Sequence, residues 1–243
     1  MSEPRILMPE YGKYGEDQEA RLKKLATLGA HKDLSVIILT PALNDVPVRV
    51  VHSWMNLIRP PNQFSVFMST QRMEVGKAYS AAIEAILATP ELASKRYLLT
   101  LEHDNIPPPD GLVRLLERAE AHPEYAAIGG LYFTKGEDGV PQIWGNPREM
   151  PLNFKPQTPV PGELMECCGT GMGFTLYRLD LFKDERLRKP WFETKAEWNP
   201  SVGSRVFTQD LWFATDMRKY GYRCAVDCAV SVGHYDSRTD VVW

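Results

Sequence analysis

Long hydrophobic runs and zinc-type cysteine pairs are both missing from this chain of 243 residues. It contains no apolar stretch of about 18 residues, which argues against a membrane-spanning helix. The N-terminal segment also lacks the apolar core of a secretory signal, so we expect a cytoplasmic protein. The four cysteines, Cys167, Cys168, Cys224 and Cys228, do not have the spacing of paired zinc knuckles, and we expect reduced, mostly buried thiols.

An excess of basic residues is missing too. The 28 lysines and arginines are matched by 31 acidic residues, which gives a formal net charge of −3. Because proteins that bind duplex nucleic acid usually carry a basic excess or stripe, we expect no nucleic-acid partner. A hydrophobic content of 44% and a charged content of 24% are typical of a globular protein, and the length suits one α/β domain.

Short apolar runs alternate with helical patterns in the first half of the chain. We expect strands at residues 34–39, 63–68, 97–101 and 126–131, a helix at 74–87, a helix that Asn44 or Asp45 caps with Pro47 in its first turn, and a helix that Asp110 caps. This alternation predicts an α/β fold with a mostly parallel central sheet and helices on both faces.

The second half has a different pattern. Residues 134–160 are rich in proline and glycine and include a hairpin turn signal, GEDG. We expect a strand at 173–177, a helix at 209–220 that Thr208 caps and Gly221 ends, and short strands at 224–226 and 230–232. The stretch 183–207 reads as long and irregular, which is typical of a binding loop or lid.

The most informative motif is Glu102-His103-Asp104-Asn105, at the end of an expected buried strand. Ligands of open α/β sheets bind outside the carboxyl ends of the strands. Two carboxylates two residues apart suit Mg²⁺ or Mn²⁺, which in turn bridge to substrate phosphates. The alternative interpretation is a solvated acidic turn that merely ends the strand.

Four further features are candidates, each with a structural alternative. Asp210 is either a general base or an acid favoured by its helix N-terminus. His234 is either a metal ligand or a structural histidine. The glycines from Gly169 to Gly173 either let the backbone approach a ligand or form a tight turn. Arg72 and Lys77, at the start of a helix, either favour a phosphate or belong to a solvated helix face.

The order of these pieces resembles the GT-A fold glycosyltransferases, most of all the inverting family 2 type. It runs from TPALN through EHDN, GTGMGF and TQD to a C-terminal histidine. The resemblance implies one GT-A domain over residues 34–236, with a nucleotide-binding half (34–131) and an acceptor-binding half (132–236). Residues 1–33 are then an N-terminal extension, and residues 237–243 a C-terminal tail.

The resemblance also implies roles for individual residues. Asp104 would bind Mn²⁺ or Mg²⁺ together with His234, and Glu102 would bind the metal or the donor. Asp210 would be the base. The implied donor-binding residues are Thr40, Pro41, Ala42, Asn44, Asp45, Arg72, Lys77, Glu102, His103 and Gly171, and the implied acceptor-binding residues are Trp191 and Trp198. Two positions depart from the family pattern, because Glu102 replaces an aspartate and Gln209 a glutamate.

The implied reaction transfers a hexosyl group from a nucleoside diphosphate sugar, with UDP expected first and GDP next, to a hydroxyl of a glycan, small molecule, protein or nucleobase. Direct attack would invert the anomeric centre, and a retaining route stays open. A nucleotidyltransferase is the nearest alternative, although TPALNDVP lacks the glycine-rich loop of that class. A non-catalytic nucleotide-sugar-binding module is another. A metal-dependent hydrolase needs more ligands than the five histidines and their neighbours offer.

Overall fold

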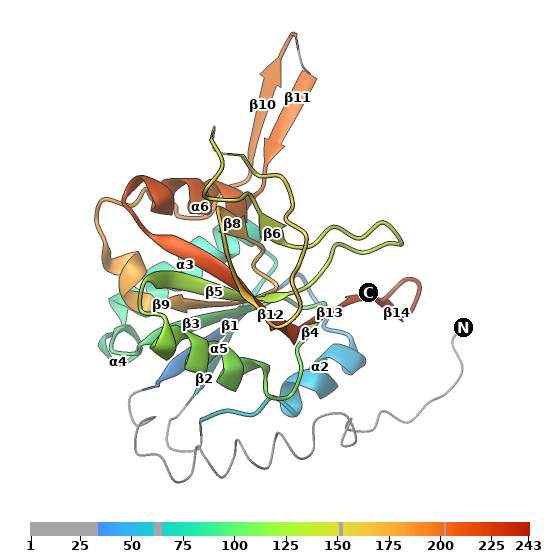
Figure 1. Cartoon of the computed structure of the whole chain (residues 1–243). Helices are drawn as coiled ribbons and strands as arrows, with labels where there is room; N and C mark the ends of the chain where they lie inside the picture. The colour runs from blue at the N-terminus through green and yellow to red at the C-terminus, as the bar shows by residue number, and fades with distance from the viewer. Residues whose placement is uncertain (1–33, 61–64, 151–152, 202) are drawn as a thin grey trace.

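The computed structural model describes residues 34–60, 65–150, 153–201 and 203–243. The expected extension, residues 1–33, and part of the expected strand at 63–68 lie outside these ranges. The centre is a seven-stranded sheet (Figure 1). Its strands, in spatial order, are β2 (Val66–Gln71), β1 (Val36–Ala42), β3 (Tyr97–Leu101), β9 (Phe174–Arg178), β5 (Tyr125–Leu131), β12 (Arg223–Ser231) and β7 (Leu164–Cys167).

Most of this sheet is parallel, as the alternating pattern predicts. Strand β1 pairs in parallel with β2 and β3, and β12 pairs in parallel with β5. Strand β9 runs antiparallel between β3 and β5, and β7 is antiparallel at the edge. The carboxyl ends of β1, β3 and β5 therefore point to one side of the molecule, where a ligand site is expected.

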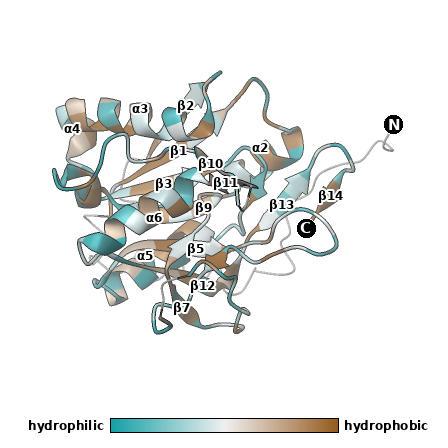
Figure 2. Cartoon of the chain, turned by 90° about the horizontal axis from the view of Figure 1, so that it is seen from above, coloured by the Kyte–Doolittle hydropathy of each residue, from teal (hydrophilic) through white to brown (hydrophobic). Residues whose placement is uncertain are grey.

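Helices cover both faces of the sheet, because the strands are apolar on both sides (Figures 1 and 2). Helices α3 (Val75–Ala88) and α6 (Gln209–Lys219) pack on one face, and α2 (Val48–Met55) and α5 (Gly111–Ala121) on the other. In β1, Ile37 and Leu39 join the first core, whereas Val36 and Ile38 join the second. Two short helical segments, α4 (Pro90–Ala93) and η2 (Leu179–Lys183), lie in the connections. Among the described helices, none is both long and apolar enough to cross a bilayer.

The first strand and the helix after it differ from the expected boundaries. Strand β1 continues past residue 39, because Thr40, Pro41 and Ala42 pair with Ser69, Thr70 and Gln71 of β2. Helix α2 consequently begins later, with Pro47 as its N-cap residue. The prediction that Asn44 or Asp45 caps it is wrong, and both residues lie in the exposed loop that follows β1.

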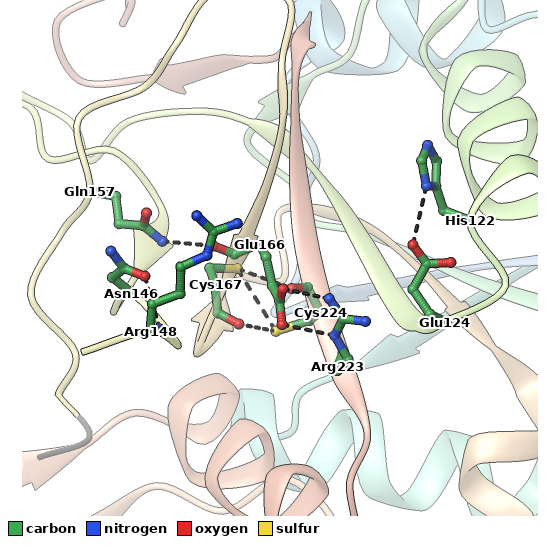
Figure 3. A network of polar contacts seen from close by, with 9 residues as sticks. All are labelled: His122, Glu124, Asn146, Arg148, Gln157, Glu166, Cys167, Arg223 and Cys224. Atoms are coloured by element: carbon green, nitrogen blue, oxygen red, sulfur yellow. Dashed lines mark hydrogen bonds and ion pairs between the residues drawn. The ribbon is translucent and has the colours of Figure 1, made fainter. Parts of the chain in front are cut away.

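The expected strands at 224–226 and 230–232 form one long strand, β12. Its antiparallel partner β7 places Cys167 opposite Cys224, with 3.8 Å between the two Sγ atoms (Figure 3). Beside them, Arg223 donates a hydrogen bond of 2.9 Å from Nε to Glu166. All four cysteines are buried free thiols, as predicted.

Within the described ranges, three small sheets complete the fold. Strands β10 (Lys195–Asn199) and β11 (Gly203–Phe207) form a hairpin that projects from the body (Figure 1), so the prediction of an irregular stretch at 183–207 is wrong there. Strand β6 (Ile143–Trp144) pairs with β8 (Gly169–Thr170). The third sheet has the order β14-β13-β4, with bounds Val241–Val242, Gly233–Asp236 and Asn105–Ile106. Residues 237–243 therefore belong to the folded domain rather than to a tail.

Candidate functional site

The acidic motif lies directly after β3 and is held by neighbouring strands. The backbone N–H of Glu102 donates to the carbonyl of Gly173 at 3.0 Å, and that of Asn105 donates back to Glu102 at 3.0 Å. The carbonyl of Asp104 accepts a hydrogen bond of 2.7 Å from the N–H of Tyr235 in β13. These bonds place Asp104 between the end of the main sheet and the C-terminal strands.

Asp104 and His234, far apart in the sequence, are brought together. Nε2 of His234 lies 3.3 Å from Oδ2 of Asp104, and Nδ1 lies 2.8 Å from the carbonyl oxygen of Phe133. A carbonyl only accepts, so Nδ1 carries a proton. Nε2 and the Asp104 carboxylate therefore face each other at a distance that a shared proton or a bound cation would bridge. Metal-binding histidines commonly donate their other ring N–H to a carbonyl in this way.

A third charged group meets the same carboxylate. Nζ of Lys135 donates to Oδ2 of Asp104 at 2.6 Å. Burial opposes ionisation of Asp104, but hydrogen bonds from His234 and Lys135 outweigh it and hold the pKa of Asp104 well below its usual range. Asp104 is therefore an anion at neutral pH, which is the form that binds a cation.

The protein groups present fit Mg²⁺ or Mn²⁺ only in part. Within the described ranges, no group of three or more His, Cys, Asp or Glu side chains is arranged to hold a metal ion. Asp104 and His234 supply one carboxylate and one imidazole, and ions of this kind usually take their remaining ligands from water and substrate phosphates. Both the metal and its ligands stay predictions.

Glu102 differs from Asp104 in its electrostatic environment. Burial, together with the negative charges of Asp104 and Asp210, raises the pKa of Glu102 to about 8. A carboxyl group that keeps its proton donates a hydrogen bond and is a poor cation ligand. The metal-binding and donor-binding roles of Glu102 both stay predictions.

Asp210 stands at the first turn of α6, close enough to Glu102 to influence its pKa. The helix can approach because Gly169 has no side chain: a Cβ there would lie 2.8 Å from Leu211 Cδ2 and 3.1 Å from the Cβ of Ala214. Burial raises the pKa of Asp210, although hydrogen bonds from Thr208 and the Leu211 N–H oppose that rise. A raised pKa makes the ionised carboxylate a stronger base.

Several of the expected donor-binding residues lie around the end of β1. The backbone N–H of Arg72 donates to the carbonyl of Ala42 at 3.3 Å, and its Nε donates to Asn44 at 3.4 Å. Arg72 has a φ of 57°, a left-handed conformation that is uncommon for this residue type. Thr40 Oγ1 is buried without a hydrogen-bond partner in the described structure, and its donor-binding role stays a prediction.

The start of α3 is not an open anion site. The carboxylate of Glu74 caps this helix by accepting a hydrogen bond of 2.9 Å from the backbone N–H of Lys77. Since an anionic side chain already occupies the N-terminus, the prediction that the helix end itself favours a phosphate is wrong. The Lys77 side chain is exposed. The donor-binding roles of Lys77, Asp45 and His103 stay predictions.

Gly171 is explained by packing. A Cβ on this residue would lie 2.1 Å from the hydroxyl oxygen of Tyr132, so glycine is required by a neighbouring side chain. The expectation that this backbone lies open to a ligand is wrong at Gly171, which is buried.

The two tryptophans expected in one acceptor loop have different environments. Trp191 is 1% exposed and packs on Phe182 with a centroid distance of 5.7 Å. Its assignment to the acceptor site is therefore wrong, since a fully buried ring cannot stack on a substrate. Trp198 is 76% exposed on the projecting hairpin, and its acceptor-binding role stays a prediction.

Sequence reasoning missed Lys135 and Tyr132. Both follow β5, whose carboxyl end lies on the same side of the sheet as that of β3. Tyr132 accepts a hydrogen bond of 3.0 Å from the Gly173 N–H and packs edge-on against His234. Their position directly after a buried strand is the signal that could have identified them.

Comparisons with known proteins find one family model and a number of solved structures that match this chain. The family model described as Glycosyl transferase family 2 matches residues 16–184, which is more than half of the chain. Among solved structures, 107 chains match. One is the crystal structure of A197 from STIV, with 15% identity, a TM-score of 0.59, and coverage of 86% of this chain and 92% of that chain. At that identity the likeness shows the fold alone. No curated protein matches.

Proposed function

The chain belongs to glycosyl transferase family 2, and we propose that it transfers a hexosyl group from a nucleoside diphosphate sugar to an acceptor hydroxyl. The observation that carries this proposal is the grouping of charged residues around Asp104. The family match ends at residue 184 and so includes Asp104, whereas Asp210 and His234 come from beyond it. Their convergence on the same sheet edge supports a catalytic site rather than an acidic turn.

In this proposal, residues of the chain would bind the donor and assist departure of the leaving group. Asp104 and His234 would hold Mn²⁺ or Mg²⁺, and such an ion supplies Lewis-acid stabilisation of a departing nucleoside diphosphate. Glu102, with its proton retained, would donate a hydrogen bond to the donor. The residues around the end of β1, including Thr40, Asn44 and Arg72, would contact the base. UDP is our first expectation for the nucleotide, and GDP the second.

Asp210 would act as the general base. Its carboxylate would accept the proton of the acceptor hydroxyl while that oxygen attacks the anomeric carbon. When the hydroxyl attacks the anomeric carbon from the side opposite the leaving group, the anomeric centre is inverted. NMR of the product anomer tests this step, since a product of retained configuration would contradict the inverting assignment.

Thermal unfolding in the presence of nucleotides tests the donor class. The chain would be heated with UDP, GDP, CDP or dTDP, each with Mn²⁺ or with EDTA. A ligand present at about 100 times its Kd stabilises the folded state by about 2.7 kcal/mol. We expect one nucleotide to raise Tm only when Mn²⁺ is present.

Two variants make the experiment specific. Asp104→Ala is expected to lose the Mn²⁺-dependent stabilisation. Asp180→Ala is the matched control, because the Asp180 carboxylate is 85% exposed and pairs with Lys183, which the proposed site does not include. If no nucleotide changes Tm under any condition, the proposed function is wrong.

A further inference from the structure

Building on the proposed function, we propose that Lys135 is an internal counter-ion of the cation site. Its ammonium group donates a hydrogen bond of 2.6 Å to Oδ2 of Asp104. When a divalent cation binds Asp104, the ammonium moves to the diphosphate of the donor. Lys135 would therefore compete with the metal and assist the nucleotide, which are effects of opposite sign.

The first observation is that one carboxylate oxygen atom lies close to two basic side chains. Oδ2 of Asp104 lies 2.6 Å from Lys135 Nζ and 3.3 Å from His234 Nε2. The three side chains are between 17% and 32% exposed, so this cluster lies at an accessible edge rather than in the core. A ligand can therefore reach the ion pair without unfolding the domain.

The second observation is that hydrogen bonds between neighbouring residues hold the backbone around Lys135, whereas its side chain is a flexible stem. The N–H of Thr134 donates to the carbonyl of Val140 at 2.9 Å, and the Val140 N–H donates to the Thr134 hydroxyl at 2.8 Å. Gly136 follows with a φ of 114° and turns the chain. Because these contacts anchor its backbone, the ammonium moves by rotation of a flexible four-carbon stem, and it stays near Asp104.

Competition follows from charge. A divalent cation that coordinates the Asp104 carboxylate would stand next to the Lys135 ammonium, and the two positive charges repel. The donor's diphosphate would approach the bound cation from the open side and bring new anionic oxygens within reach of the lysine. An ammonium displaced from Asp104 therefore has a second anion nearby.

The interpretation of Lys135 as a purely structural ion pair predicts a different result. An ion pair that is reachable by solvent contributes little to folding, and under this interpretation its removal would leave ligand affinities unchanged. Measured affinities for the metal and for the nucleotide therefore separate the two interpretations.

The experiment is a pair of titrations on the full chain. Mn²⁺ is titrated without nucleotide, with the free ion followed by electron paramagnetic resonance. The nucleoside diphosphate that stabilises the unmodified chain is then titrated by calorimetry at saturating Mn²⁺. We expect Lys135→Gln to tighten Mn²⁺ binding several-fold and to weaken nucleotide binding about tenfold, the effect of one lost charge-assisted hydrogen bond.

Two further variants serve as controls. Lys135→Arg keeps the charge and is expected to change both affinities less than Lys135→Gln does. Lys219→Gln removes a lysine that pairs with Asp216 at 3.3 Å on α6, and both affinities should be unchanged.

The outcomes separate this inference from the proposed function. If the unmodified chain binds none of the four nucleotides, both are wrong. If it binds one, and Lys135→Gln changes neither affinity or weakens both, the proposed function stands and the counter-ion role of Lys135 is overturned.

Discussion

At the scale of single residues, the candidate site depends on a few side chains that the fold places in contrasting environments. Asp104 is held ionised by Lys135 and His234, whereas burial raises the pKa values of Glu102 and Asp210. Carboxyl groups whose pKa values are pushed apart can serve different roles in one reaction. This contrast is the basis on which we propose cation binding for Asp104 and proton acceptance for Asp210.

The first residue-scale prediction concerns Asp210. Only an ionised carboxylate accepts a proton, so kcat/KM should rise with pH through the pKa of Asp210, at a pH above the ordinary aspartate range of about 3.9. Asp210→Asn should lower kcat by about 10²- to 10⁴-fold and leave the nucleotide Kd unchanged. Steady-state kinetics and calorimetry check both parts. A variant that keeps full turnover would exclude Asp210 as the base.

The second residue-scale prediction concerns Gly171 and Tyr132. Gly171→Ala places a methyl group against the tyrosine hydroxyl and should destabilise the fold by about 1–3 kcal/mol. In the Tyr132→Phe background the same change should cost at least about 1 kcal/mol less, because the clashing oxygen is gone. Urea denaturation of the four proteins measures this coupling. Additive effects would show that the two residues do not collide.

At the scale of elements, the segment between η2 and α6 divides into a buried part and a projecting part. Trp191 and Phe192 fill the core against Phe182, whereas Lys195–Asn199 and Gly203–Phe207 form a hairpin. Aromatic residues in both parts look alike in sequence. Their environments differ because Phe192 packs against Tyr79 of α3 and Phe213 of α6, whereas the hairpin projects from the body (Figure 1).

This division predicts a difference in stability between two tryptophan variants. Trp191→Ala should lower the free energy of unfolding by about 3–5 kcal/mol, because it empties a large volume in the core. Trp198→Ala, which removes a ring that is 76% exposed, should change it by no more than about 0.5 kcal/mol. Urea denaturation followed by circular dichroism compares them, and equal losses would contradict the placement of the two rings.

At the scale of the whole molecule, the C-terminal strands hold His234 at the candidate site. Strand β13 pairs with β4 directly after the acidic motif, with His234 opposite Asn105, and β14 covers the other edge of β13. Trp243 and His234 exchange two backbone hydrogen bonds of 3.0 Å. The end of the chain thus fixes a residue that faces Asp104.

Removal of residues 241–243 tests this dependence. The truncation deletes β14 and both backbone bonds to His234, so we expect Mn²⁺ affinity to fall about 10- to 100-fold, as for lost supporting contacts in other metal sites. Trp243→Ala keeps the backbone bonds and is the control. Mn²⁺ titration gives the result, and unchanged affinity in the truncated chain would mean that β14 does not position His234 for metal binding.

Much of the fold could be predicted from the sequence. The strand at 97–101 has the expected bounds, the helix at 75–88 is shifted by one residue at both ends, and the helix at 209–219 ends one residue early. These elements have strong local signals, namely apolar runs or helical periodicity. The prediction of the α2 N-cap was wrong because strand pairing extends β1 to Ala42. No local sequence pattern indicates that pairing.

The candidate site could be predicted in part. Asp104, Asp210 and His234 stood out because each follows or precedes a recognisable element. Lys135 did not, because a lysine in a turn has no distinctive signal until the neighbouring strand is known. Trp191 was assigned to the surface because an irregular sequence pattern does not reveal burial.

The sequence by itself determined the alternation of strands and helices, the absence of a zinc-type cysteine pattern, and the acidic motif at a strand end. These are local properties of residue type and spacing. Only the tertiary structure decided that β9 runs antiparallel inside the sheet, that Tyr132 fills the space over Gly171, and that Lys135 and His234 meet at one oxygen of Asp104. Those contacts join residues up to 130 positions apart, and they exist because strand pairing and core packing bring distant segments to the same edge.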